Sequence, residues 1–448
     1  MLNHKAPDRM PVYPLVNSIS RQSLGITYEE WTKDINKCAE AIIRTTDELE
    51  LDCLCTLVDL SVEAADFGQE LLYFKDKAAC PDPAQRVVPT EGDYDKIPRI
   101  DPAKGKRMSE HVELCRKLVE ARGKDKPVVA FVFGPLGIVS MLRGQQEMFM
   151  DLYTAPDEVK KGVEIVSDVL CDWIDQLCAT GIDAVMFDTL YASRSIMSAE
   201  MWDEFEGVYM TRIAERVRSH GCAVMIHNCG QGAYFDEQYE RMKPVLFSFA
   251  HPPQGCADMK EAVEKYADKM ILMGTIDPGW FMTATPETLK ARVEEELAVF
   301  GPSKRYVLST GCEYPACLDF AFPRQMVDMA KAYTYKYRPA IPIPPSARGP
   351  PEPAGRASRN GAARRKGRFP SPGPASVRPR PQKTGRAARS PPSRPPCPGY
   401  TDISPAPPFP LPAPDSGSPM MPLKRHPALL RPDEGPLPPH FPIEIFFP

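Results

Sequence analysis

Several features common in membrane and secreted proteins are missing from this 448-residue sequence. It contains no run of about 18 consecutive apolar residues, the length that a membrane-spanning helix needs. The start, MLNHKAPDRMPVYPLV, has no basic segment followed by a long apolar one, so we expect no secretory signal peptide. Many of the 13 cysteines stand singly within apolar runs, which is typical of reduced intracellular proteins rather than of disulfide frameworks. We therefore expect a soluble, cytoplasmic protein without a membrane partner.

Proline and positive charge are concentrated near the end of the chain. Residues 346–448 hold 28 of the 51 prolines, with 16 Lys and Arg against 6 Asp and Glu. The rest of the chain is acidic, so its own electric field does not favour nucleic acid. We predict a folded domain over 1–340 and a disordered, Pro/Arg-rich tail over 341–448. The tail could bind RNA or an acidic surface, or it could be a translated extension without a function.

Short apolar runs alternate with longer amphipathic segments along the predicted domain. Eight runs are typical of strands buried on both faces of a parallel sheet: 11–17, 54–59, 127–134, 182–188, 222–228, 245–251, 270–276 and 305–311. Helical patterns lie between them, although the link 233–243 is short for a helix. This alternation predicts a (β/α)8 TIM barrel of the α/β class. A doubly wound open sheet is the alternative, but it would need a glycine-rich nucleotide loop after the first strand, and NSISRQS is not one.

The predicted strand ends are more polar than the strand bodies. In a (β/α)8 barrel the carboxyl ends of the strands meet at one mouth, where catalytic groups lie. The residues at these ends are Asn17, Asp59, Gly134–Pro135, Asp188, His227–Asn228–Cys229, His251, Asp277 and Gly311–Cys312–Glu313. Among them, Asp59, Asp188 and His251 are our candidates for orienting ligands or contacting a polar substrate. The two aspartates could instead cap the turns that follow them, and His251 could be an ordinary loop histidine.

His227 and Cys229 stand two residues apart at the end of one predicted strand. Side chains two apart on a strand point the same way, so both would face the mouth. A catalytic zinc site needs a third protein ligand, and Cys312 at the end of the eighth predicted strand is the best candidate, with Cys256 and Cys317 as alternatives. One histidine and two cysteines favour zinc over magnesium or calcium. The same residues could also belong simply to the core, where histidine and cysteine are often buried.

Six segments in combination resemble the uroporphyrinogen decarboxylase superfamily across about residues 1–340. These are RMPVYPLVN, VDLSVEAADFG (58–68), FGPLGIVSMLRG (133–144), FDTLYASRSIMSAEMWDEF (187–205), IHNCGQG (226–232) and LSTGCEYPACLDFAFPRQMVDMAKAY (308–333). The His-x-Cys-Gly and Gly-Cys-Glu motifs are similar to those of its corrinoid-dependent methyltransferase branch. That resemblance implies zinc held by His227, Cys229 and Cys312, and a corrinoid that a separate protein carries. Glu313 or Asp59 could fill the fourth zinc position.

One segment departs from the true uroporphyrinogen decarboxylases. Those enzymes carry Arg-Gln-Ala-Gly-Arg after the first strand, which grips substrate carboxylates. This chain has SISRQSLG, in which Arg21 and Gln22 are a partial match without the second arginine. Asp59 lies where the decarboxylases have their pyrrole-binding aspartate, so decarboxylation stays open as an alternative.

We therefore predict a zinc-dependent methyltransferase that moves a methyl group between a corrinoid (cobalamin) protein and a small thiol or methyl ether. Uroporphyrinogen decarboxylase activity is the alternative, and a non-catalytic protein tethered by its basic tail is a third hypothesis. The resemblance also allows a homodimer. No nucleic-acid partner is expected for the barrel itself.

Overall fold

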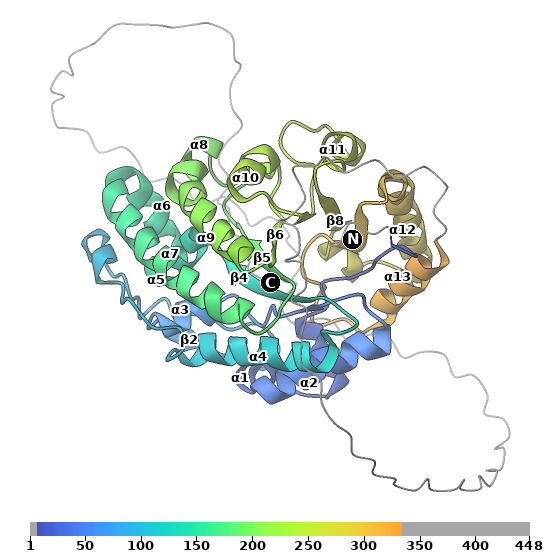
Figure 1. The fold of residues 1–448 in the computed structure, drawn as a ribbon, viewed down its shortest axis with the longest axis horizontal. Coiled ribbons are helices and arrows are strands. Elements are labelled where there is room, and N and C mark those ends of the chain that lie inside the picture. The colour runs from blue at the N-terminus through green and yellow to red at the C-terminus, as the bar shows by residue number, and fades with distance from the viewer. Residues whose placement is uncertain (1–6, 334–448) are drawn as a thin grey trace, which may run out of the picture. The chain divides into compact units, whose positions relative to one another are not determined.

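Seven parallel strands form the centre of the fold, in the order β1-β4-β5-β6-β7-β8-β9 (Figure 1). They are β1 (Leu54–Cys55), β4 (Val128–Phe133), β5 (Ala184–Asp188), β6 (Ala223–Asn228), β7 (Leu246–Phe249), β8 (Ile271–Ile276) and β9 (Tyr306–Thr310). The computed structural model describes residues 7–333, and the predicted tail over 341–448 lies outside the described residues. Every residue of β4 and β5 is buried, which explains why both sequences are apolar up to Asp188 at the end of β5.

A short N-terminal segment closes the sheet between β9 and β1. Val12 forms a parallel bridge with Leu308 of β9, and its carbonyl accepts a hydrogen bond from the Asp52 N–H. The first predicted strand is reduced to this bridge because Pro11 and Pro14 lack the N–H groups that a regular ladder needs. With the segment in place, the (β/α)8 barrel is confirmed and the open doubly wound sheet is wrong.

Helices lie around the outside of the strands (Figure 1). The α-helices are α1 (Tyr28–Lys33), α2 (Ile35–Leu49), α3 (Val62–Asp66), α4 (Lys106–Arg122), α5 (Pro135–Arg143), α6 (Gln145–Thr154), α7 (Pro156–Cys178), α8 (Ala199–Trp202), α9 (Val208–Ser219), α10 (Phe235–Met242), α11 (Met259–Tyr266), α12 (Pro286–Phe300) and α13 (Ala321–Ala332). Shorter elements are η1 (Ser18–Ser23), η2 (Glu91–Lys96), η3 (Asp203–Gly207), η4 (Gly279–Met282), η5 (Gly301–Ser303) and the hairpin of β2 (Leu71–Leu72) and β3 (Cys80–Pro81). The link 233–243 does form a helix, the eight-residue α10. Within the described residues, no helix is long and apolar enough to span a membrane.

A π-helical turn interrupts the helix that follows β5. α8, η3 and α9 follow one another without a break, and η3 is the π-helical part. Such turns insert one extra residue and change the direction in which side chains point. Here Glu206 within the turn and Trp202 just before it are both buried, and the Trp202 indole N–H donates to the Glu206 carboxylate at 2.8 Å. The turn thus brings a carboxylate into the protein interior.

Candidate metal centre

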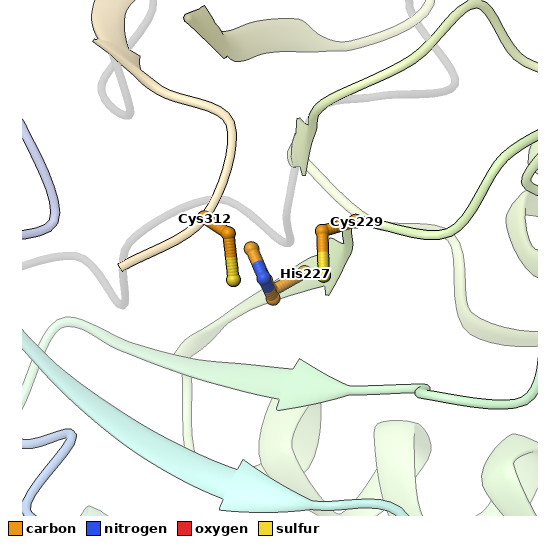
Figure 2. Close-up of side chains that lie close together, drawn as sticks. All are labelled: His227, Cys229 and Cys312. Carbon is orange, nitrogen blue, oxygen red and sulfur yellow. The ribbon is translucent and has the colours of Figure 1, made fainter. Parts of the chain in front are cut away.

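The end of β6 carries two of the three predicted metal ligands. β6 lies between β5 and β7, and His227 is in register with Asp188 of β5 and Ser248 of β7. The His227 side chain is buried. Cys229 follows one residue after the strand ends. Figure 2 shows both side chains at this end of β6.

Cys312 completes a cluster with these two residues. It follows β9, three strands along the sheet from β6, and reaches the same place because the carboxyl ends of the strands meet at the barrel mouth. The ligand atoms of His227, Cys229 and Cys312 all lie within 4.8 Å of one another (Figure 2). In the part of the chain that the structure describes, no other group of three His, Cys, Asp or Glu side chains could hold a metal, so Cys256 and Cys317 lie outside such a site.

The turn that carries Cys229 is held against the loop after β5. The Asn228 side chain accepts a hydrogen bond from the Gly230 N–H at 2.9 Å and donates to the Thr189 carbonyl at 2.6 Å. A Cβ atom at Gly230 would lie 2.4 Å from the Ser193 hydroxyl oxygen, which is closer than real contacts allow. Glycine is needed at this position because the two loops approach each other so closely.

Hydrogen bonding inside the cluster gives its two thiols different pKa values. A hydrogen bond with Cys312 is the main reason that the pKa of Cys229 lies well below its usual range, and His227 lowers it further. The same hydrogen bond, with burial, raises the pKa of Cys312. Burial alone would lower the pKa of His227, but Cys229 and nearby acidic groups outweigh it and raise that pKa. Of the two thiols, Cys229 is therefore the one whose thiolate form the cluster favours.

Known proteins with similar sequences and structures agree with the resemblance seen in the sequence. A family model described as uroporphyrinogen decarboxylase (URO-D) matches residues 1–333. The chain belongs to the uroporphyrinogen decarboxylase family.

Relatives of this family member include both methyltransferases and decarboxylases. Methylcobamide:CoM methyltransferase MtbA of Methanosarcina mazei is 22% identical over 339 residues, which cover 75% of this chain and 96% of the relative. A uroporphyrinogen decarboxylase of Anaeromyxobacter dehalogenans is 21% identical over 322 residues, which cover 69% of this chain and 89% of the relative. A solved methyltransferase structure from Methanosarcina mazei has a TM-score of 0.63 at 16% identity and covers 74% of this chain and 96% of that chain. That structure shares the fold.

Asp188 lies beside the metal-binding candidates of this URO-D family member. It ends β5 in register with His227 and keeps 9% of its surface exposed. Burial raises the pKa of its carboxyl to about 7; His227 opposes that rise and Cys229 adds to it. Within residues 7–333 the carboxylate has no hydrogen-bond partner, which leaves its oxygens available to a ligand at the mouth.

Asp59 is held in a buried ion pair. One carboxylate oxygen accepts from the Arg107 guanidinium at 2.6 Å and from the Thr32 hydroxyl, and the other accepts from the Ser61 N–H at 2.8 Å. Both of its oxygens are therefore already engaged by the protein. Arg107 is the second residue of α4. The sequence did not predict its contact with Asp59, because the two residues are 48 positions apart and no local pattern links them.

Two further sequence candidates lie near the mouth but outside the cluster. Glu313 accepts the Ser18 N–H at 2.8 Å, and burial raises the pKa of its carboxyl. Its hydrogen bond ties the loop after β9 to the start of η1. His251 follows β7 on a loop and is half-buried. Neither Glu313 nor Asp59 belongs to the group whose ligand atoms cluster with Cys312.

Arg21 and Gln22, which partly match the Arg-Gln-Ala-Gly-Arg segment of the decarboxylases, hold a loop in place in this structure. The Arg21 guanidinium donates to the Ala316 carbonyl at 3.0 Å, and the Gln22 amide donates to the Ala316 and Leu318 carbonyls at 3.1 and 2.7 Å. Both side chains therefore hold the main chain of the loop that follows Cys312. They thus tie η1 to the loop after Cys312.

Two buried glutamates that the sequence analysis missed hold the turn after β4. Glu63 accepts the Phe133 N–H at 3.0 Å, and Glu206 accepts the Leu136 N–H at 3.2 Å. Between them, the Gly134 N–H donates to the Asp188 carbonyl at 2.9 Å. Burial raises the pKa of both glutamates to about 7. A short motif gives no sign of these contacts, because each glutamate comes from a distant segment.

Proposed function

We propose that this protein is a methyltransferase that uses zinc to move a methyl group between a corrinoid and a small thiol or methyl ether. The observation that carries the proposal is the cluster of His227, Cys229 and Cys312, whose ligand atoms come from two separate strand ends to within 4.8 Å. An imidazole and two thiols are soft donors that suit zinc, and three protein ligands leave a position for a substrate. The similarity to methylcobamide:CoM methyltransferase MtbA supports the same reading.

The residues around the cluster would divide the work of binding and orienting. A zinc ion there would supply Lewis acidity that lowers the pKa of a bound thiol or polarises an ether oxygen. Asp188, with unengaged carboxylate oxygens at the mouth, would accept a hydrogen bond from the substrate, and His251 is the second candidate for substrate contact. Asp59 would act indirectly, by holding Arg107 and the loop after β1. The corrinoid would arrive on a separate partner protein.

Metal analysis of the purified full-length protein tests the first half of this proposal. We expect about one zinc per chain, lost in Cys229→Ser and in Cys312→Ser. Cys256→Ser is the matched control, since it removes a half-buried thiol outside the cluster and should keep the zinc. Carefully prepared wild-type protein without zinc, or equal loss in the Cys256 variant, would contradict the proposal.

A methyl-transfer assay tests the second half. Methylcobalamin can stand in for the corrinoid protein, with a panel of small thiols as acceptors. We expect a methylated thiol by mass spectrometry, formed by the wild type and by Cys256→Ser but not by Cys312→Ser. Zinc-loaded protein that transfers no methyl group in either direction, with thiols or with aryl methyl ethers, would argue against this chemistry.

Decarboxylation of uroporphyrinogen is the second candidate, because the chain also has a uroporphyrinogen decarboxylase among its relatives. The second arginine of the decarboxylase segment is missing here, and Arg21 and Gln22 donate to main-chain carbonyls, which counts against this candidate. Formation of coproporphyrinogen by the purified protein would favour this alternative over methyl transfer.

A further inference from the structure

Ser248 is in contact with the metal-binding candidate His227 from the neighbouring strand. Its hydroxyl oxygen lies 3.0 Å from His227 Nδ1, and both side chains are buried. The two residues are directly opposite each other in the β6–β7 register, so the contact follows from the sheet and not from a mobile loop. On another side, the His227 ring lies beside Phe131 of β4, with ring centroids 6.0 Å apart. The orientation of the imidazole is thus set by two strands.

This contact decides which ring nitrogen is left for other partners. With Nδ1 facing Ser248, Nε2 is the nitrogen that remains for the side where Cys229 and Cys312 cluster. A neutral imidazole carries one N–H and one lone pair, and a metal needs the lone pair. If the serine hydroxyl accepts from Nδ1–H, the lone pair lies on Nε2. Within the described residues, the Ser248 hydroxyl has no other hydrogen-bond partner, so it is free to rotate and accept from Nδ1–H when a metal takes the lone pair of Nε2.

We propose that Ser248 is a positioning residue for the metal: it accepts the Nδ1–H hydrogen bond of His227 when zinc is bound, and so holds the ring at the angle that presents Nε2 to the ion. The inference rests on the proposed function, because it assumes that zinc is the ion bound. Partners of this kind behind a ligating histidine commonly change metal affinity by about 10- to 100-fold. A hydroxyl can donate or accept by rotating, so it can accept the proton that a metal on Nε2 leaves at Nδ1, and this single oxygen is the polar contact of that nitrogen.

The first test measures zinc affinity by competition with a chromophoric chelator, on full-length protein. Ser248→Ala should bind zinc about 10- to 100-fold more weakly than the wild type, and Ser248→Thr, which keeps the hydroxyl, should recover most of the loss. Ser167→Ala is the matched control: Ser167 is also a buried serine with one hydrogen bond, to the Val163 carbonyl of α7, but it is not in contact with the cluster. Its zinc affinity should equal that of the wild type.

The second test needs no substitution and so does not depend on a variant that folds. The ¹⁵N spectrum of histidine-labelled, zinc-loaded wild type should show His227 with its proton on Nδ1. A proton on Nε2, an unchanged affinity in Ser248→Ala, or an equal loss in Ser167→Ala would each overturn the role of Ser248. Wild-type protein that binds no zinc would instead overturn the proposed function itself, which keeps the two failures apart.

Discussion

Replacing Asp59 by alanine should destabilise the barrel far more than an ordinary surface change. The Asp59 side chain is completely buried and that of Arg107 is 9% exposed, with 2.6 Å between the paired atoms. Removing the carboxylate leaves the guanidinium with the Tyr73 and Thr32 hydroxyls at 3.2 and 3.4 Å, both neutral. Breaking one side of a buried ion pair typically costs about 3–5 kcal/mol. Against a total of about 5–15 kcal/mol for a typical domain, that loss is large.

A double variant separates the cost of the stranded charge from the loss of packing. Arg107→Met keeps most of the side-chain volume without the charge, so Asp59→Ala/Arg107→Met should be more stable than Asp59→Ala alone. Urea unfolding followed by circular dichroism gives the free energies, provided that the dependence on urea stays the same among the variants. The reasoning is refuted if Asp59→Ala loses less than about 1 kcal/mol, or if the two single losses simply add in the double variant.

The same double variant also tests what Asp59 does in the reaction. If Asp59 only holds Arg107 and the loop after β1, activity should return in part as stability returns. If it contacts the substrate, as the sequence alone suggested, the double variant should be folded, loaded with zinc and inactive. Zinc content and methyl transfer measured on one preparation distinguish these outcomes.

Two further predictions concern the turns that flank the cluster. The folded-state pKa of Glu206 is raised by burial to about 7, so folding favours its protonated form, and the stability that this gives is lost as pH rises through about 7. Urea unfolding between pH 5 and 8 should therefore show the wild type losing up to about 3 kcal/mol relative to Glu206→Gln; parallel curves would contradict the buried, protonated carboxyl. Gly230→Ala should weaken zinc binding in the chelator competition, because its new carbon would lie 2.4 Å from the Ser193 hydroxyl oxygen. Gly279→Ala, whose added carbon meets its nearest neighbour at 3.4 Å, should bind zinc like the wild type, and a similar loss in both variants would remove the steric explanation.

The barrel could be predicted because its strands are buried on both faces and therefore appear as uninterrupted apolar runs. β4 lies entirely within the predicted run 127–134, for this reason. The first run is the exception: it has the apolar residues of a strand, but Pro11 and Pro14 remove ladder donors, and only the bridge at Val12 remains. Hydropathy reports burial, whereas proline decides how many hydrogen bonds a buried segment can make.

The metal-binding candidates could be predicted from position, but the residues that support them could not. His227 and Cys229 follow from alternation at a strand end, and Cys312 follows from barrel topology, which brings all the strand ends together. Ser248 depends on the register between β6 and β7, which a single sequence does not reveal. Arg107 depends on a contact between a helix and a strand end that are far apart in the chain, and no spacing rule reaches that distance.

The barrel closes beside β9 through the short N-terminal segment, so the residues of the cluster stand on strands that are not equally well paired. Within residues 7–333, the N-terminal segment meets β9 at the single bridge between Val12 and Leu308, whereas β6 has five residue pairs with β5 and four with β7. His227 thus lies on a strand that is paired along its length on both sides, while Cys312 follows β9, which among the described strands is paired along its length only with β8. Brief opening motions begin where hydrogen bonds are fewest, so they should carry Cys312 away from the other two side chains first. An ion bound by all three side chains would connect the loop after β9 to the end of β6, and its release would begin at the Cys312 sulfur.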